Sequence, residues 1–152
     1  MKISTKGRYA LRIMIDVAEN SRYGKVTVKE ISGRQDISIK YMEQIANILT
    51  RANLLRSERG SQGGYALTRS PDRYTAGEIL RTIEGKFAPV ACLEDEINQC
   101  KRANICKTVN FWNGLYKVID DYLDSVTLQD LITQNTIFID PEFNNRRPQC
   151  CE

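Results

Sequence analysis

The sequence predicts a mainly α-helical fold with a small β-wing, namely a winged helix-turn-helix followed by a long C-terminal dimerisation helix. Three observations predict this fold. Residues 27–52 carry two short helical patterns, each preceded by a helix-capping residue. Residues 54–67 carry two short strand patterns on either side of a glycine-rich turn. Residues 108–126 repeat apolar side chains at helical spacing.

The first helix is expected to begin after an N-terminal arm, with Ser4 or Thr5 as its cap. Its apolar stripe consists of Tyr9, Ile13, Met14 and Val17. Lys6, Arg8 and Arg12 lie near its start, where positive charge is unfavourable beside the helix dipole. A nearby phosphate would compensate for this charge, and a solvated basic face is the alternative interpretation.

The helix-turn-helix is predicted from two caps. Thr27 and Glu30 form a capping box, residues 34–36 form the turn, and Ser38 caps the second helix. The buried stripe of the second helix is Met42, Ile45, Ile48, Leu49 and Ala52. Its opposite face presents Lys40, Tyr41, Glu43, Gln44, Asn47 and Arg51. A polar, partly basic face of this kind is typical of a recognition helix in the major groove of DNA.

The wing is expected to be a hairpin whose strands are residues 54–58 and 65–67. Arg59 begins the turn, and its guanidinium suits the concentrated negative potential of a minor groove. Gly60 and Ser61 allow the backbone to approach DNA closely. The candidate DNA-contacting residues are therefore Ser38, Lys40, Tyr41, Glu43, Gln44, Arg59, Gly60 and Ser61. An ordinary helix pair followed by a hairpin is the alternative.

The charge distribution favours DNA binding over that alternative. Residues 1–73 contain 14 Lys/Arg and 7 Asp/Glu, whereas residues 74–152 contain 8 and 12, so the net charge of +3 divides into +7 and −4. No apolar run reaches the roughly 20 residues that span a bilayer, and no signal peptide is recognisable, so a cytoplasmic protein without membrane association is expected. The absence of histidine removes the commonest general base and the usual hydrolytic triads.

The second half of the chain is expected to begin with a helix over residues 75–84, opened by a Thr75–Glu78 capping box and ended by Gly85. A long helix then carries the stripe Phe111, Trp112, Leu115, Val118, Ile119, Tyr122 and Leu123. This stripe exceeds what a small core needs, so part of it is expected to form a homodimer interface. A capping box at Thr127 and Asp130 opens a last short helix ending near Gln134.

Four regions follow from these elements. Residues 1–85 form the winged helix-turn-helix, residues 86–107 a cysteine loop, and residues 108–134 the dimerisation helix with the short final helix. Residues 135–152 are expected to be a flexible tail.

The cysteine loop contains Cys92, Cys100 and Cys106 with the spacing C-x7-C-x5-C. Three thiolates in one irregular segment can converge on a metal, and they favour zinc, Cu(I) or an iron–sulfur cluster. Zinc sites usually show C-x2-C pairs or histidines, and neither occurs here. Free thiols are the alternative, although buried packing does not suit the polar surroundings of these cysteines.

Several segments together resemble a known family. These are MKISTKGRYALRIMIDVA, YMEQI, RGSQGGYAL, TAGEILRTIEG and the three-cysteine loop. They resemble the IscR-type iron–sulfur cluster regulators, within the winged-helix family of bacterial cluster-sensing transcriptional repressors. The resemblance covers residues 1 to about 134 and implies a homodimer that binds promoter DNA and controls cluster-assembly genes. It also implies a [2Fe-2S] cluster on the three loop cysteines, base contacts from Glu43 and Gln44, and minor-groove entry by Arg59.

The chain departs from that family at the fourth cluster ligand. Members of that family resemble one another in having a histidine ligand three residues after the third cysteine. This chain has Val109 at that position. The ligand is left open among Glu94, Asp95, Glu96, Asn110, Cys150, Cys151 and an exogenous thiol. A [4Fe-4S] cluster, as in the related nitric-oxide sensor, is also open, but the carboxylate ligand of that sensor corresponds here to Arg8.

Two other functions are alternatives to cluster sensing. A related repressor of cysteine metabolism lacks the cluster and responds through a partner enzyme, and the three loop cysteines count against it. A thiol-redox enzyme or electron carrier is the more distant alternative, because the chain has neither histidine nor a C-x-x-C motif. The sequence therefore predicts a DNA-binding regulator rather than an enzyme.

Overall fold

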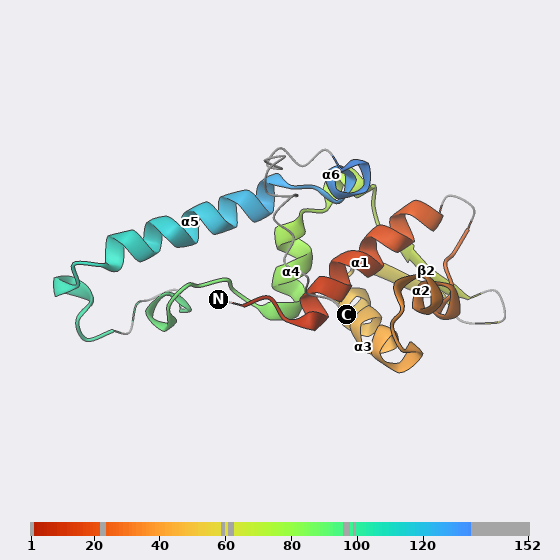
Figure 1. The fold of residues 1–152 in the computed structure, drawn as a ribbon, viewed down its shortest axis with the longest axis horizontal. Coiled ribbons are helices and arrows are strands. Elements are labelled where there is room, and N and C mark those ends of the chain that lie inside the picture. The colour runs from red at the N-terminus through yellow and green to blue at the C-terminus, as the bar shows by residue number, and fades with distance from the viewer. Residues whose placement is uncertain are drawn as a thin grey trace, which may run out of the picture.

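The computed structural model describes residues 2–21, 24–58, 60, 63–95, 98 and 100–134. Within these ranges the fold is mainly helical with a small antiparallel sheet, which confirms the predicted fold class (Figure 1). The first part contains α1 Thr5–Asn20, α2 Val28–Gln35, α3 Ile39–Arg51, β1 Leu55–Glu58 and β2 Gly64–Leu67. The second contains η2 Pro71–Arg73, α4 Ala76–Glu84, η3 Ala91–Leu93, η4 Ala103–Ile105, α5 Val109–Ser125 and α6 Leu128–Thr133.

Helix α1 runs through the middle of the body (Figure 1). It begins after Ser4, whose Oγ accepts a hydrogen bond from the Gly7 N–H at 3.2 Å, so Ser4 rather than Thr5 is the cap. Its fully buried side chains are Ala10, Ile13, Met14 and Val17. Because α1 contacts α2, α3, α4, β2 and α6, it is the common support of the helix-turn-helix, the wing and the C-terminal half.

The helix-turn-helix forms as predicted, with one boundary shifted. The Thr27–Glu30 capping box is complete, and Ser38 Oγ accepts the Tyr41 N–H at 3.4 Å. The predicted turn over residues 34–36 is too long, because α2 continues through Gln35. Asp36 ends the helix alone by adopting a left-handed conformation with φ of 52°. Such a conformation is available to Asp at modest cost.

The apolar stripe of α3 is confirmed in its centre and wrong at its end. Met42, Ile45 and Leu49 are fully buried, and Ile48 is half-buried. Ala52, predicted to be buried, is exposed because it is the C-cap residue of α3.

The wing is an antiparallel hairpin in which Leu55 pairs with Leu67 and Glu58 with Gly64. Leu54 lies before the first strand instead of within it, and Gly64 joins the second strand. A third segment contacts the sheet, because Val26 and Tyr65 exchange backbone hydrogen bonds of 3.0 and 2.8 Å. A Cβ at Gly64 would lie 2.6 Å from the Val26 oxygen, so this pairing requires glycine.

Helix α4 begins at the predicted cap but without the predicted capping box. Thr75 Oγ1 accepts the Glu78 N–H at 3.0 Å. The Glu78 carboxylate does not return to the cap and instead forms an ion pair with Arg69. The capping-box prediction is therefore half wrong, because a nearby arginine binds the Glu78 carboxylate.

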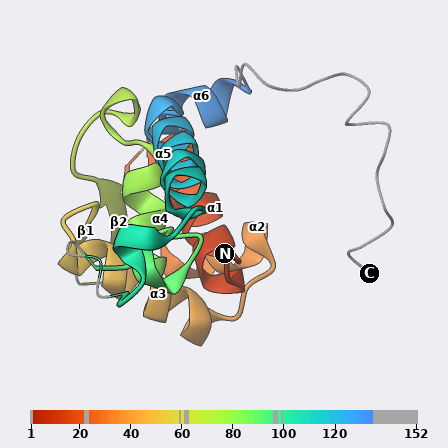
Figure 2. The same ribbon diagram turned by 90° about the vertical axis from the view of Figure 1, so that its left-hand side faces the viewer.

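Helix α5 projects away from the body, and Figures 1 and 2 show it on the side opposite α3. Its C-terminal end returns to the body through backbone pairing. The Ala76 N–H donates to the Val126 oxygen at 2.8 Å, and the Leu128 N–H donates to the Tyr74 oxygen at 2.9 Å. Helix α6 then begins with the predicted Thr127–Asp130 capping box and buries Leu128. Among the helices described here, none combines the length and apolar character needed to cross a membrane.

Candidate nucleic-acid interface and cysteine loop

The outer face of α3 presents polar side chains to solvent. Lys40, Glu43 and Gln44 are exposed, as are Asn47 and Arg51. They alternate with the buried stripe of α3, which holds the helix against α1, α2 and α4. The core therefore fixes the helix and leaves donors, acceptors and both signs of charge on its free face. This is the arrangement that base edges and phosphates in a major groove require.

Two of the predicted DNA-contacting residues of α3 also have structural roles. Ser38 caps α3, and Tyr41 is half-buried with its ring edge-on to Tyr9 of α1 at a centroid distance of 5.8 Å. Arg12 lies over the same Tyr9 ring at 5.0 Å. The first turn of α3 is thus held against α1 by the aromatic contact between Tyr41 and Tyr9. The sequence alone predicts Tyr41 only as a residue of the DNA-facing side.

An ion pair between the buried carboxylate of Asp16 and the partly exposed Arg34 fixes α2 against α1. Asp16 is only 2% exposed, and its carboxylate accepts three hydrogen bonds from the Arg34 guanidinium at 2.6, 3.0 and 3.3 Å. Gln35 Nε2 donates to the same carboxylate at 2.8 Å. Arg12 in turn donates to the Gln35 side chain at 2.9 Å. A side chain of α1 therefore determines where the end of α2, and with it the turn before α3, is placed.

The tip of the wing is only partly described. Arg59 and Ser61, two of the predicted DNA-contacting residues, lie outside the described residues. Gly60 is exposed with φ of 115°, a conformation that favours glycine. At the base of the wing, Lys25 and Glu58 form an ion pair.

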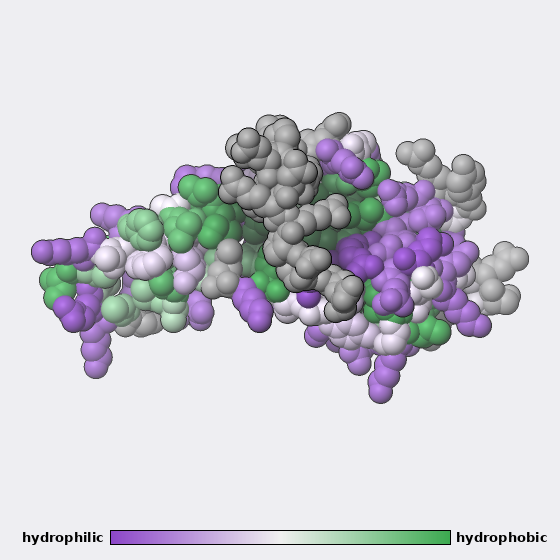
Figure 3. Space-filling model, viewed as in Figure 1, coloured by the Kyte–Doolittle hydropathy of each residue, from purple (hydrophilic) through white to green (hydrophobic). Residues whose placement is uncertain are grey.

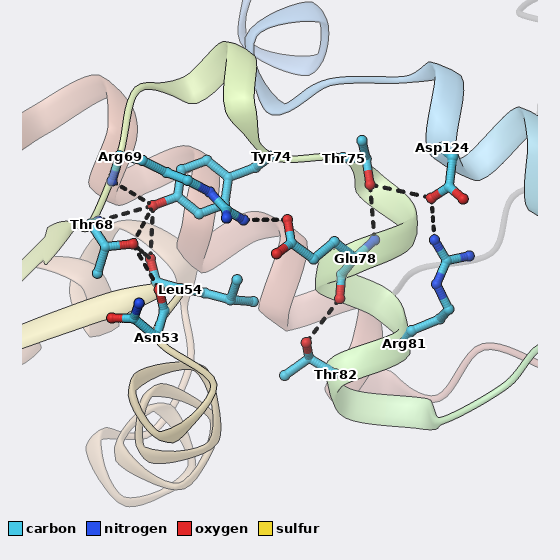
Figure 4. Close-up of polar contacts among 10 residues, drawn as sticks. All are labelled: Asn53, Leu54, Thr68, Arg69, Tyr74, Thr75, Glu78, Arg81, Thr82 and Asp124. Atoms are coloured by element: carbon cyan, nitrogen blue, oxygen red, sulfur yellow. Dashed lines mark hydrogen bonds and ion pairs between the residues drawn. The ribbon is translucent and has the colours of Figure 1, made fainter.

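Tyr74 joins the wing to the end of α3, as Figure 4 shows. The residue is fully buried, and its hydroxyl accepts the N–H groups of Thr68 at 2.9 Å and Arg69 at 3.0 Å. The same hydroxyl donates to the Leu54 oxygen at 3.0 Å. Arg69 covers the Tyr74 ring at 4.2 Å and pairs with Glu78 of α4. One side chain therefore ties together the end of α3, the end of the wing and the start of α4.

The long helix is connected to this region through Arg81 of α4. The Arg81 guanidinium donates to Asp120 at 2.9 Å and also pairs with Asp124, both on α5 (Figure 4 shows the Asp124 pair). Thr75 Oγ1 lies 3.3 Å from the same Asp124 carboxylate. A Cβ at Gly77 would overlap the side-chain ends of Asp124 and Arg81, so this ion pair lies directly against that glycine. A shift of α5 would therefore be transmitted directly to α4.

Most of the stripe on α5 is exposed in the part of the chain that the structure describes. Phe111 is 63% exposed, Val118 66% and Tyr122 45%. No residue of α5 is fully buried. Figure 3 shows hydrophobic residues among hydrophilic ones along this helix. An apolar groove of about 280 Å³ lies beside it, lined by Ile3, Phe87, Val118, Ile119, Tyr122 and Leu123. An exposed apolar surface of this kind marks an interaction site.

The cysteine loop is irregular, with two short 3-10 turns that the sequence analysis did not predict. Cys92 lies within η3 and is half-buried, Cys100 is exposed, and Cys106 ends η4 and is half-buried. Hydrogen bonding to the Thr108 hydroxyl, 3.4 Å away, lowers the pKa of the Cys106 thiol, and Arg102 acts in the same direction. A lowered pKa increases the thiolate fraction, which is the form that binds metal.

The described part of the chain contains no cluster of three Cys, Asp or Glu side chains close enough to hold a metal ion. The three thiols thus have the right chemistry for an iron–sulfur site without being gathered into one. Glu94, Asp95 and Asn110, three candidates for the fourth ligand, are exposed. Glu96, Cys150 and Cys151 lie outside the described residues, as does the predicted tail, residues 135–152.

The comparison with known families follows from this architecture. The Rrf2 family model, described as an iron-dependent transcriptional regulator, matches residues 3–134. The chain is a member of the Rrf2 family. Regulators of this family bind DNA.

Two branches of the Rrf2 family are both similar to the chain. The regulator CymR of Bacillus subtilis is 43% identical over 86% of this chain and 89% of its own. Its solved structure, described as the global cysteine regulator, has a TM-score of 0.72 at 37% identity, covering 88% and 98% of the two chains. The regulator IscR of Aliivibrio salmonicida is 35% identical over 90% and 80%. The structure of T. potens IscR has a TM-score of 0.69 at 33% identity, covering 98% and 93%.

These comparisons confirm that the chain is an Rrf2 regulator. They do not decide between the IscR and CymR branches. The relatives named above are transcriptional regulators, in line with the prediction that the chain is not an enzyme. The sequence analysis missed Asp16, Tyr74 and Arg81 because each acts through a partner distant in sequence. An acidic residue within the apolar stripe of α1 is the one local signal that pointed to such a partner.

Proposed function

We propose that this Rrf2 regulator binds promoter DNA as a homodimer, with α3 in the major groove and the wing against the adjacent minor groove. The observation that carries the proposal is the exposed polar face of α3 on a helix fixed by the core. Glu43 can accept a hydrogen bond from cytosine N4, and Gln44 can bind adenine through two hydrogen bonds. Arg59 at the wing supplies the cation that a narrow minor groove attracts.

The second subunit is expected to pack on α5. Exposed Phe111, Val118 and Tyr122 would be covered by the partner, and the apolar groove beside α5 would be filled. Two copies related by a two-fold axis present two α3 helices, which matches a palindromic site with half-sites about one helical turn apart. The negative charge of residues 74–152 suits a half that stays away from phosphates.

The signal is expected to enter through the cysteine loop. Three thiols, one with a lowered pKa, form a soft donor set that suits an iron–sulfur cluster. A [2Fe-2S] cluster is the first choice and [4Fe-4S] the second, with the fourth ligand open. Holding either cluster requires the loop to bring Cys92, Cys100 and Cys106 closer together than they lie in the described structure.

The path from the loop to the DNA runs through contacts described above. Cys106 lies three residues before the first residue of α5, so a change in the loop is passed to that helix. Arg81 joins α5 to α4, and Glu78 of α4 joins Arg69 beside Tyr74. Tyr74 holds the end of α3 and the wing. Loop state can thereby alter the angle between the two DNA-contacting elements.

A second candidate function is regulation of cysteine or sulfur metabolism without a cluster. The 43% identity to the B. subtilis CymR favours it, as does the absence of an assembled metal site among the described residues. In this case the signal would be a partner protein, and α5 or the loop would be its contact surface.

Anaerobic reconstitution with iron and sulfide separates the two candidates. Cluster sensing predicts visible absorbance with stoichiometric iron and sulfide in the wild-type dimer, and loss of both in Cys92→Ala, Cys100→Ala or Cys106→Ala. Cys150→Ala and Cys151→Ala test whether the tail supplies the fourth ligand. Circular dichroism and light scattering confirm that each variant still folds and dimerises. A colourless wild-type protein that nevertheless binds palindromic DNA would reject the cluster and favour the second candidate.

A further inference from the structure

Ile39 is an exposed aliphatic residue at the start of the recognition helix. It is the first residue of α3, directly after the cap Ser38, and 45% of its surface is exposed. It is not among the residues of the hydrophobic core or those packed against that core. A β-branched aliphatic side chain at a solvent-facing position stabilises neither the helix nor the hydrophobic core.

Dimerisation does not account for this residue. The other large apolar side chains exposed in the described chain are Ile3, Ile105, Phe111, Leu115, Val118 and Tyr122. These belong to η4, to α5 or to the groove that Ile3 shares with α5. Ile39 lies instead on α3, which Figures 1 and 2 place on the opposite side of the body from α5. A second subunit packed on α5 would therefore leave Ile39 uncovered.

The neighbours of Ile39 indicate what does cover it. Glu43 lies one helical turn further along the same face and is exposed, and Lys40 is exposed beside it. The N-terminal residues of a recognition helix are those that contact base edges in the major groove. Of the groups displayed there, only the C5-methyl of thymine is apolar. An aliphatic residue among polar readers is thus matched to that one group.

We propose that Ile39 is a specificity-determining residue that recognises thymine by contact with its C5-methyl group, next to the base contacted by Glu43. This inference rests on the proposed role of α3 in DNA binding. Contact with the methyl removes apolar surface of both groups from water, whereas cytosine at the same position places a C–H and an amino group against the isoleucine.

Uracil tests the proposal, because it differs from thymine by that methyl group alone. A duplex is first selected from a random palindromic library with the wild-type protein. Deoxyuridine then replaces thymine at one position of the half-site at a time, with the same change made in both half-sites of the duplex. The DNA affinity of the protein for each duplex is measured at fixed salt. At one thymine position, deoxyuridine should weaken DNA binding by the wild-type protein roughly tenfold, because about one buried methyl group is lost from each half-site. Other thymines should tolerate the change.

The substitution Ile39→Ala supplies the second half of the test. Ile39→Ala should weaken binding to the thymine duplex by a similar factor. The affinity of this variant should not fall further when deoxyuridine replaces the critical thymine, so the protein and DNA changes are not additive. Ile39→Val, which keeps one γ-methyl group in reach, should retain part of the discrimination. Because Ile39 is outside the core, both variants should unfold at the wild-type denaturant concentration.

The possible failures are distinct. A wild-type protein that selects no duplex would overturn both this inference and the proposed function. Selection of a duplex in which no thymine responds to uracil would overturn this inference alone. The same would follow if Ile39→Ala discriminated thymine from uracil as well as the wild type, because another side chain would then contact the methyl group.

Discussion

Replacement of Tyr74 by phenylalanine isolates the connection between the wing and the end of α3. The ring and its contact with Arg69 are retained, and only the buried hydroxyl is lost. Two N–H groups, those of Thr68 and Arg69, lose their acceptor. The Leu54 oxygen loses its donor at 3.0 Å but keeps the Thr68 hydroxyl at 3.5 Å.

The expected cost of Tyr74→Phe is about 2–4 kcal/mol in the free energy of unfolding, since each polar group left without a partner costs about 1–3 kcal/mol when fully buried. The cost for each group should lie in the lower part of the range of about 1–3 kcal/mol, because the N–H groups of Thr68 and Arg69 are only partly buried. Small domains are stable by about 5–15 kcal/mol, so the variant should still fold. Its DNA affinity should fall as well, because the wing is then held to the end of α3 by fewer hydrogen bonds, those of the Thr68 hydroxyl.

Urea unfolding followed by circular dichroism measures the first effect, and a DNA titration measures the second. Tyr9→Phe is the matched control, because Tyr9 packs through its ring against Tyr41 and Arg12. The control should lose less than about 0.5 kcal/mol, because the substitution keeps both ring contacts. A Tyr74→Phe variant as stable as this control would refute the role assigned to the hydroxyl.

Three further substitutions test the interface. Arg59→Ala should weaken specific DNA binding by about 1–3 kcal/mol while dimerisation persists, and unchanged affinity at physiological salt would remove Arg59 from the interface. Glu43→Ala should broaden the sequence preference in a selection experiment more than it lowers affinity, whereas equal loss on every duplex would contradict base recognition. Asp16→Asn should lower the free energy of unfolding by about 1–3 kcal/mol, because charged hydrogen bonds to Arg34 and Gln35 become neutral or are lost. Urea midpoints check this last effect, and an unaltered midpoint would show that the α1–α2 contact does not depend on the ion pair.

Local signals made most of the fold predictable from the sequence. Ser38, Thr27 and Thr127 cap their helices as predicted, because each cap bonds to a backbone N–H only three residues away. The long stripe on α5 was also recognised, because helical spacing needs no knowledge of the partner. Glu78 shows the limit of such reasoning. Its spacing from Thr75 predicts a capping box, but Arg69 binds its carboxylate across the fold.

Contacts between distant segments explain most of the remaining gap. The Asp16–Arg34 pair, the hydroxyl of Tyr74 and the Arg81–Asp120 pair each join residues that come together only after the chain has folded. The cysteine loop is a different case. Its C-x7-C-x5-C spacing predicts ligand chemistry, but irregular backbone leaves the relative positions of the thiols undetermined by any helical or strand period. All the predicted DNA contacts stay predictions, and two of the residues concerned, Arg59 and Ser61, also lie outside the described residues.

The most direct test of the proposed function compares the DNA affinity of one protein preparation in two states of its cysteine loop. The wild-type dimer is reconstituted anaerobically, titrated against its selected palindromic duplex, exposed to air until its visible absorbance is lost, and titrated again. Cys106→Ala, treated identically, controls for effects of oxygen elsewhere in the chain. The account predicts that affinity or sequence preference changes in the wild type, with helical content preserved, and does not change in the variant. Identical DNA binding before and after loss of the absorbance would contradict the claim that the cysteine loop governs the recognition helix.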